Sequence, residues 1–206
     1  MKATNSINSI SELSIFFEKV FDLLNEEIFG GELPKPIITL APTKQAYGHY
    51  TPYEAWDVHD EPKREINIST YDINRPIEKV ITTEVHEMCH LYNDLILEVK
   101  DCSNDGRYHN AKFKRTAEEH WLIVEKSENY GWCITKPSEK LLNWINAHPE
   151  LKDIEMYKKN YEKPEKKVKK KPNRFQFKYK CPNCGSECKA TAKITVFCTR
   201  CNHQMY

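Results

Sequence analysis

The stretch that most constrains the fold is His86-Glu87-Met88-Cys89-His90, because it places two histidines four residues apart inside an apolar segment. On an α-helix this spacing leaves the imidazoles roughly 40° apart around the axis and about 6 Å apart along it. Both can therefore reach one metal ion. Glu87 lies beside the first histidine, where its carboxylate can contact a metal-bound water. The pattern is typical of zinc hydrolases with two histidine ligands and a glutamate as general base.

The segment around this motif is predicted to be a largely buried helix. Pro76 suits its first position, with Asp72 or Asn74 as the cap. Burying polar side chains in the middle of such a helix costs free energy unless they have partners, and a metal ion would be such a partner. The alternative is a chance match in a core helix whose histidines are satisfied by hydrogen bonds. The apolar face repeats at three- and four-residue steps and comprises Ile77, Val80, Ile81, Val85, Met88, Leu91, Tyr92, Leu95 and Ile96.

A catalytic zinc ion needs three protein ligands and one open position, so the motif is one ligand short. We expect His109 to be the third ligand, because it opens a predicted helix that can pack back on the motif helix. The rival ligands are His120, Asp94 and Cys102. Asp94 is better interpreted as a partner of a ligand or a solvated carboxylate. His49 and His59 lie in early loops and are expected at the surface.

The remaining pattern predicts a helix from Ser9 or Ser11 to Ile28, and three strands at 36–40, 45–50 and 64–69. The polar segment 52–62 is expected to be a loop. Further helices are predicted over 108–126 and 137–145. A small sheet beside the motif helix can offer an edge strand to an extended substrate chain by backbone pairing. Tyr47–Tyr50 is our candidate for that strand.

Charge divides the chain into two parts. Residues 158–180 contain eleven Lys and Arg against two Glu, a net charge of +9, and residues 181–206 add +2. Since the whole chain carries +1, residues 1–157 carry −10. We therefore expect a domain at 1–157, a basic flexible linker at 158–172 and a small module at 173–206. Such a basic block favours nucleic acid as a partner, although a solvated lysine-rich tether would have the same composition.

The last module contains two Cys-x-x-Cys pairs separated by thirteen residues. This spacing is typical of a structural Cys₄ zinc site in a zinc ribbon. About thirty residues bury too little surface to fold alone, so the metal must contribute much of the stability. Strands are predicted at 189–193 and 194–197, and Cys188 and His203 are not expected to bind metal. The four ligands are Cys181, Cys184, Cys198 and Cys201.

Aromatic and basic residues alternate around this Cys₄ site. Lysines can contact phosphates while rings stack on unpaired bases, so single-stranded or distorted DNA is a plausible ligand. The alternative is that the rings form the small core of the ribbon. The residues concerned are Phe175, Phe177, Lys178, Tyr179, Lys180, Arg200 and Tyr206.

Composition also bears on the compartment. No apolar run reaches the length of a membrane span, and the first residues lack a signal-peptide core. We expect a protein of the reducing cytoplasm, with association with the nucleoid if DNA is the partner. There, paired cysteines indicate metal binding rather than disulfides. The sequence predicts no oligomeric state.

Five segments occur in the order seen in SprT-like zinc metallopeptidases, the Spartan-related family, which this chain therefore resembles over about residues 10–135. The C-terminal cysteine pairs match the zinc ribbon that many relatives carry. Two positions depart from the usual pattern: Asn110 replaces a glycine, and Cys89 stands where a small residue is common. The five segments are Leu24–Pro34, Tyr47–Tyr50, Ile66–Ser69, Thr83–His90 and His109–Phe113.

The resemblance implies an α+β, minigluzincin-like metallopeptidase domain with a small sheet packed on helices. It also implies a catalytic Zn²⁺ held by His86, His90 and His109, with Glu87 as the catalytic residue. The expected activity is zinc-dependent peptide-bond hydrolysis, with DNA-bound or DNA-crosslinked proteins as substrates. Two alternatives remain: a non-catalytic nucleic-acid-binding scaffold with two structural zinc sites, and a peptidase directed to another protein or RNA.

Overall fold

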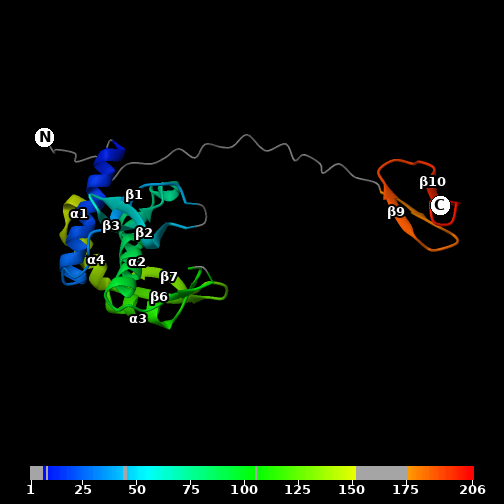
Figure 1. The fold of residues 1–206 in the computed structure, drawn as a ribbon. Coiled ribbons are helices and arrows are strands. Elements are labelled where there is room, and N and C mark those ends of the chain that lie inside the picture. The colour runs from blue at the N-terminus through cyan, green and yellow to red at the C-terminus, as the bar shows by residue number, and fades with distance from the viewer. Residues whose placement is uncertain (1–6, 8, 44–45, 105, 152–175) are drawn as a thin grey trace. The chain divides into compact units, whose positions relative to one another are not determined.

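The structure is a computed structural model, and it describes residues 7, 9–43, 46–104, 106–151 and 176–206 (Figure 1). The chain divides into two units, Met1–Asn160 and Tyr161–Tyr206. The predicted linker at 158–172 and Phe175 lie outside the described residues. Both units agree with the expected α+β class, since helices and small sheets share the first unit and short strands form the second.

The first helix, α1 (Ile10–Ile28), begins where the sequence predicts. Ser9 is the cap: its side chain accepts a hydrogen bond from the Glu12 N–H at 3.1 Å, which satisfies one unpaired group of the first turn. The stripe of apolar residues at three- and four-residue steps is buried, which explains why periodicity alone located this helix. The buried residues are Leu13, Phe17, Val20, Phe21 and Leu24.

The motif helix, α2 (Ile77–Leu95), is the central element of the first unit. It contacts α1, α3 and the strands of two sheets, and Figure 1 shows it between them. The prediction for its start was wrong in detail. Pro76 occupies the N-cap, with a φ of −47° and a ψ of 138°, and among the described residues no side-chain hydrogen bond caps the helix. Packing on all sides stabilises α2 instead, since helices in proteins depend on tertiary contacts more than on caps.

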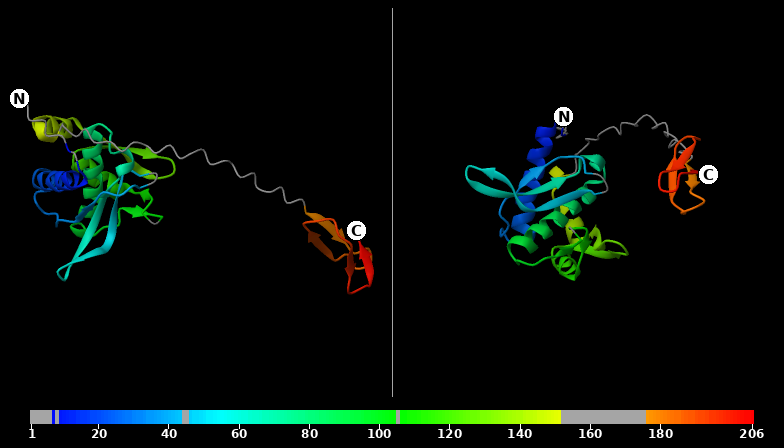
Figure 2. Two further views of the ribbon diagram at one scale, coloured as in Figure 1. Left: turned by 90° about the horizontal axis from the view of Figure 1, so that it is seen from above. Right: turned by 45° about the vertical axis from the view of Figure 1, so that its right-hand side comes forward.

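The first sheet has the strand order β1-β3-β2, formed by β1 (Ile37–Thr39), β3 (Glu61–Ile68) and β2 (Gly48–Val58). The predicted loop at 52–62 was wrong. These residues form the outer part of a β2–β3 hairpin, with both turn residues, His59 and Asp60, in left-handed conformation. Figure 2 shows this hairpin projecting beyond the body of the unit. Most side chains there are exposed on both faces, so the apolar alternation that marks a strand is absent.

The second sheet, with the order β4-β5-β7-β6, was not predicted. Its strands are β4 (Cys102–Ser103), β5 (Tyr108–His109), β7 (Gly131–Pro137) and β6 (Leu122–Ser127). The predicted helix at 108–126 is shorter: α3 spans Ala111–Glu119. Trp121, with a φ of 67°, turns the chain out of the helix, and β6 begins directly afterwards. Burial of Leu122 and Val124 alternates with exposure of Ile123, which is the pattern of a half-buried strand.

The first unit is closed by α4 (Glu139–Ala147), which is capped by Ser138 near the predicted start. Two short 3₁₀ helices, η1 (Thr70–Asp72) and η2 (Pro149–Leu151), complete the unit. One continuous apolar core joins the helices to the strands, and Phe17, Phe21, Met88, Phe113 and Leu141 are among its fully buried members. Burying each such side chain contributes about 1.5–3 kcal/mol, so this core holds α2 in place.

The second unit consists of two antiparallel strand pairs, β8 (Phe177–Lys180) with β9 (Glu187–Ala190), and β10 (Val196–Cys198) with β11 (His203–Met205). The predicted strands at 189–193 and 194–197 overlap β9 and β10 but are shifted. Among the described residues of this unit, the buried cluster consists of Tyr179, Cys181, Cys198 and Met205. Two of those four are proposed metal ligands, so the apolar core of this unit is small.

Among the described residues, no helix combines the length and apolar character needed to cross a membrane.

Candidate metal centre

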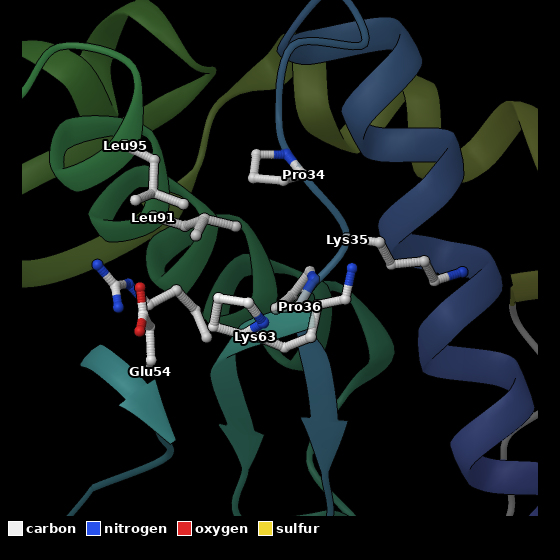
Figure 3. Close-up of a pocket in the computed structure, with 9 residues that line it drawn as sticks. Pro34, Lys35, Pro36, Glu54, Lys63, Leu91 and Leu95 are labelled. Carbon is white, nitrogen blue, oxygen red and sulfur yellow. The ribbon is translucent and has the colours of Figure 1, made fainter. Parts of the chain in front are cut away.

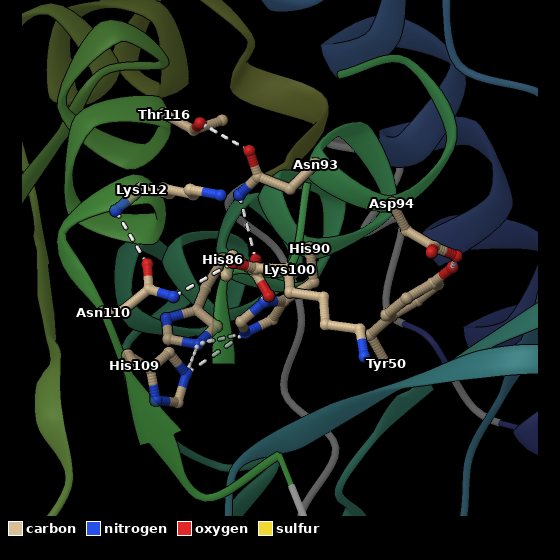
Figure 4. Close-up of polar contacts among 11 residues, drawn as sticks. Tyr50, His86, His90, Asn93, Asp94, Lys100, His109, Asn110, Lys112 and Thr116 are labelled. Carbon is tan, nitrogen blue, oxygen red and sulfur yellow. Dashed lines mark hydrogen bonds and ion pairs between the residues drawn. The ribbon is translucent and has the colours of Figure 1, made fainter. Parts of the chain in front are cut away.

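The three histidines selected from the sequence converge in space. The Nε2 atoms of His86, His90 and His109 lie 3.1–3.2 Å from one another (Figure 4). Ligands of a tetrahedral zinc at 2.0–2.1 Å are about 3.3 Å apart, so the triangle fits such an ion. A neutral imidazole carries a single N–H, and three ring nitrogens that face a common point cannot all be paired by protons. The donor set therefore suits a metal ion.

These three imidazoles come from two elements. His86 and His90 project from successive turns of α2, as their spacing requires. His109 lies on β5, not in the first turn of a helix as predicted, and β5 pairs with β4 on one side and β7 on the other. Phe113 packs against all three rings, with centroids 4.5–4.6 Å away. The three rings are thus fixed by two rigid elements and a common apolar floor.

The rival ligands lie elsewhere or act differently. His120 is stacked on Phe29, with ring centroids 4.3 Å apart. Asp94 accepts a hydrogen bond from Tyr50 and one from Arg64. Cys102 lies close enough to His90 and Asp101 to form a second potential metal group, but it is outside the three-histidine cluster.

A carboxylate that sequence reasoning missed orients the second histidine. His90 Nδ1 lies 2.6 Å from Asp101 Oδ2, and the same oxygen accepts a bond from Asn93 at 2.9 Å. Thr116 in turn donates to Asn93 at 2.6 Å. A proton held on Nδ1 by Asp101 leaves the Nε2 lone pair of His90 free for a metal ion. His86 has a comparable neighbour, since its Nδ1 lies 3.1 Å from Thr135 Oγ1.

The protonation states favour metal binding at two of the three histidines. Burial and the neighbouring imidazoles hold the pKa of His86 well below its usual value. Burial and His90 lower the pKa of His109 to about 4. Both rings are therefore neutral at pH 7, as metal ligation requires. For His90, burial lowers the pKa, but the bond to Asp101 more than offsets it, and the net pKa is raised.

Glu87 lies on α2 between the two helical histidines, but its carboxylate is not one of the converging ligand groups. The residue is buried, and burial raises its pKa to about 7, against the opposing effects of His90 and the backbone N–H of Tyr50. A carboxyl group with a pKa near the working pH can both accept and return a proton. The position and the pKa thus fit a general base.

The edge of the first sheet passes directly over this carboxylate. A Cβ atom built on Gly48 would lie 2.8 Å from Asn67 O, 2.9 Å from Thr83 Cγ2 and 3.0 Å from Glu87 Oε1. Only glycine allows β2 to approach α2 so closely. Among the described residues β2 is the outer strand of its sheet, so one edge of the candidate segment Tyr47–Tyr50 has no partner strand and lies beside Glu87.

Asn110, which replaces the usual glycine of the resembling family, does not need left-handed backbone here. Its φ is −94°, and its side chain caps α3 by accepting the Lys112 N–H at 2.7 Å. Its Nδ2 also donates to Lys100 O at 3.0 Å. The second departure, Cys89, is fully buried in the core. Neither change disturbs the position of His109.

The second candidate site is the Cys₄ group of the C-terminal unit, whose sulfur atoms all lie within 4.8 Å of one another. Cys184 Sγ and Cys198 Sγ are 3.6 Å apart, close to the separation of about 3.7 Å expected for sulfurs bound to one tetrahedral zinc. Bonds to Ser186 lower the pKa of Cys184 to about 6, which favours the thiolate that metals bind. Cys188 and His203 lie outside this group.

A separate cavity of about 140 Å³ opens between the α1–β1 connection, the hairpin and α2 (Figure 3). None of the candidate ligands lines it, and its volume is below the usual range for small-molecule sites. Its walls are Pro34, Lys35, Pro36, Glu54, Pro62, Lys63, Arg64, Leu91 and Leu95.

The fold and the first site together define an α+β domain with a histidine cluster, built on a central helix and a short strand, that could hold a metal ion. The model of the SprT-like family matches residues 17–128, more than half of the chain, and the chain belongs to that family. The Cys₄ unit lies outside the matched residues. We found no match among curated proteins or among solved structures.

Proposed function

We propose that this protein is a zinc-dependent peptidase. The observation that carries the proposal is the convergence of three Nε2 atoms on one point with a buried carboxyl group, Glu87, on the same helix. Membership of the SprT-like family supports it, because that family is of the zinc metallopeptidase type. His86, His90 and His109 would hold the ion, and the fourth position would be open to water.

In the proposed mechanism, bound zinc supplies Lewis acidity towards a carbonyl oxygen and lowers the pKa of a water molecule towards 7. Glu87 accepts the proton of the attacking water on its carboxylate and later returns it to the leaving amine. Asp101 holds the proton of His90 on Nδ1. The free edge of β2 would pair with the backbone of an extended substrate beside Glu87.

The substitution Glu87→Gln tests this assignment. Gln keeps the size of the side chain but cannot accept the proton, so we expect zinc content to be unchanged and turnover of an unfolded protein substrate to fall roughly 100-fold or more. Glu78→Gln, in the first turn of the same helix, is the matched control and should retain activity. Wild-type turnover in the Glu87 variant would refute the role of Glu87 as general base.

We further propose that the C-terminal part directs the peptidase to DNA-bound or DNA-crosslinked proteins. The ribbon exposes the rings of Phe177, Phe197 and Tyr206, which are 39%, 59% and 75% exposed. In the sequence, Lys178 follows Phe177 directly, and Arg200 follows Phe197 by three residues. Exposed rings next to cations fit stacking on unpaired bases with contacts to phosphates.

Tyr179, which the sequence analysis included among the candidate base-stacking residues, has a structural role instead. Tyr179 is buried, and its hydroxyl accepts a hydrogen bond from the Ile194 N–H at 2.9 Å. It belongs to the small core of the ribbon and orders the segment before β10.

Deleting residues 158–206 tests the targeting proposal. Each phosphate contact that is lost should reduce the slope of log affinity against log salt by about 0.7–0.9, so binding to single-stranded DNA should weaken and depend less on salt. The histidine site should keep its zinc. An unchanged slope would contradict a DNA role for this part, and stronger binding of RNA or of protein than of DNA would identify another target.

A further inference from the structure

Tyr50 connects the sheet edge to the motif helix through its backbone. It lies opposite Ile66 in the β2–β3 pair. The Ser69 N–H donates to Tyr47 O at 2.8 Å, so the alternation of an antiparallel pair directs the backbone groups of Gly48 and Tyr50 away from β3. On that outer side, the Tyr50 N–H interacts with the Glu87 carboxylate.

The Tyr50 side chain makes a second connection to the same helix. Its hydroxyl donates to Asp94 Oδ2 at 2.5 Å, and Arg64 Nε donates to the same oxygen at 3.2 Å (Figure 4). Asp94 follows Glu87 by seven residues, which places it two turns further along the same face of α2, about 10 Å away. One residue of the strand therefore meets the helix at two points.

The second connection is well suited to fix the strand. A hydroxyl that donates to a carboxylate makes a stronger bond than one between neutral groups. The Asp94 and Arg64 side chains are only 33% and 20% exposed, so water competes weakly for the bond. Burial and Asp94 both raise the pKa of Tyr50. The hydroxyl therefore remains a donor at every pH at which the fold is expected to be stable.

The strand needs such support, because β2 has a partner strand on one side only. Beyond Thr51 its pairing with β3 is interrupted as far as Trp56. Pairing with β3 sets the register of Tyr50 in the sheet. It does not set the distance between the outer edge of β2 and α2. Gly48 permits the close approach to α2, and the contacts of Tyr50 with Glu87 and Asp94 hold the strand there.

We propose that Tyr50 and Asp94 form a positioning pair that holds the outer edge of β2 at a set distance from α2 and thereby orients Glu87 beside the histidine cluster. This role rests on the proposed peptidase function. Tyr50 and Asp94 are positioning residues and not catalytic residues, because their hydrogen bond lies away from the histidine cluster. Losing it should impair the chemical step while substrate affinity changes little.

Kinetics of four variants of the full-length, zinc-loaded protein test the pair. Tyr50→Phe and Asp94→Ala remove the bond, and kcat should fall about 10-fold or more with KM within about 2-fold. Asp94→Asn keeps an acceptor for the Tyr50 hydroxyl and should recover most of kcat. Tyr53→Phe, a 65% exposed tyrosine on the same strand, is the control and should match the wild type. Unchanged kcat in Tyr50→Phe, or an Asn variant as impaired as the Ala variant, would overturn the proposal.

Hydrogen exchange provides a measurement that does not require turnover. Amide exchange over residues 46–51 should accelerate at least about 10-fold in Tyr50→Phe and Asp94→Ala but not in Tyr53→Phe. Equal exchange in all variants would overturn the positioning role whether or not the protein cleaves peptides. If the wild type has no peptidase activity while exchange responds as expected, the proposed function fails and the link between strand and helix stands.

Discussion

Asp101 contacts a candidate metal ligand, His90, but no sequence pattern indicates this. It follows α2 in a turn-rich segment and has no fixed spacing from the motif, yet it meets His90 at 2.6 Å. Burial disfavours its charge, but the bonds from His90, Asn93 and Cys102 outweigh burial and lower its pKa. An ionised Asp101 beside the ring increases the basicity of His90 and fixes its tautomer.

Substituting Asp101 should therefore weaken metal binding. For Asp101→Ala we expect zinc affinity to fall roughly 10–100-fold, the usual effect of removing a partner of a histidine ligand. Competition with a zinc chelator measures this, and Asp57→Ala, on the exposed hairpin, is the control. An affinity equal to the wild type would show that the contact does not orient His90.

Glu84 is a second residue with an unusual environment. It is fully buried on α2, and neither carboxyl oxygen has a hydrogen-bond partner within the described part of the chain. Burial, with a smaller effect of Asp22, raises its pKa well above the usual value. Burial therefore disfavours the charged form of Glu84 in the folded protein, whereas the unfolded chain ionises it above a pH of about 4.3.

The difference between the folded and unfolded pKa of Glu84 reduces the free energy of unfolding increasingly as pH rises. Because the folded pKa lies above the unfolded one, Glu84 lowers the free energy of unfolding as pH increases above about 4.3. Glu84→Gln cannot ionise, so its stability relative to the wild type should increase from pH 5 to pH 8, by about 1 kcal/mol or more. Urea unfolding at several pH values measures it, with the exposed Glu27→Gln as control. A difference that is constant with pH would mean that Glu84 is ionised in the fold.

At the scale of elements, the contact between β2 and α2 sets how closely the sheet edge lies against Glu87. The closest approach is at Gly48, where an added methyl group would meet a backbone oxygen, the Thr83 methyl and Glu87. This contact explains why the sheet edge and the general base lie side by side.

Gly48→Ala should push the two elements apart. Overpacking of this kind costs about 1–3 kcal/mol, and we expect lower thermal stability together with reduced turnover. Thr83→Ser removes the methyl group at 2.9 Å, so the double variant should recover part of both losses. Calorimetry and a peptidase assay measure them. If Thr83→Ser does not help, the strand does not approach α2 as closely as the structure has it.

The elements also show which parts of the fold were accessible to prediction. The long helices α1 and α2 were predicted because their buried faces repeat at helical period. The outer part of the β2–β3 hairpin and β6 were missed, the first because neither face is buried, the second because Trp121 ends α3 without a glycine or proline.

In the candidate site too, the residues that a local sequence pattern marks were predicted, and those placed by packing were not. His86, Glu87 and His90 were selected from local spacing, and His109 from the number of ligands that zinc requires. Asp101, Gly48 and Tyr50 received no role at the site, or only membership of a candidate strand. Their positions depend on how β2 and the 101–110 segment pack against α2, and no local pattern encodes that packing.

At the scale of the whole molecule, the two units differ in what stabilises them. The first has a continuous apolar core, whereas the described part of the second buries four residues, two of which are cysteines of the candidate metal group. Removal of metal should therefore unfold the second unit and leave the first unit folded.

Zinc content should be two ions per chain, and one after deletion of residues 158–206. In the full chain, a strong chelator should remove both ions, abolish the slow amide exchange of the C-terminal unit and leave the secondary structure of the first unit largely intact. Elemental analysis and hydrogen exchange measure these effects. A C-terminal unit that stays protected without metal would contradict its dependence on zinc.

The open side of β2 has a consequence for what the protein can recruit. An unpaired strand will accept any extended chain, including a second copy of itself, and lengthy exposed edges promote self-association. Here the receptive stretch is brief: Pro52 has no N–H to offer, and the irregular pairing after Thr51 interrupts the ladder. The pairing proposed above would therefore require only a short extended segment of a substrate chain.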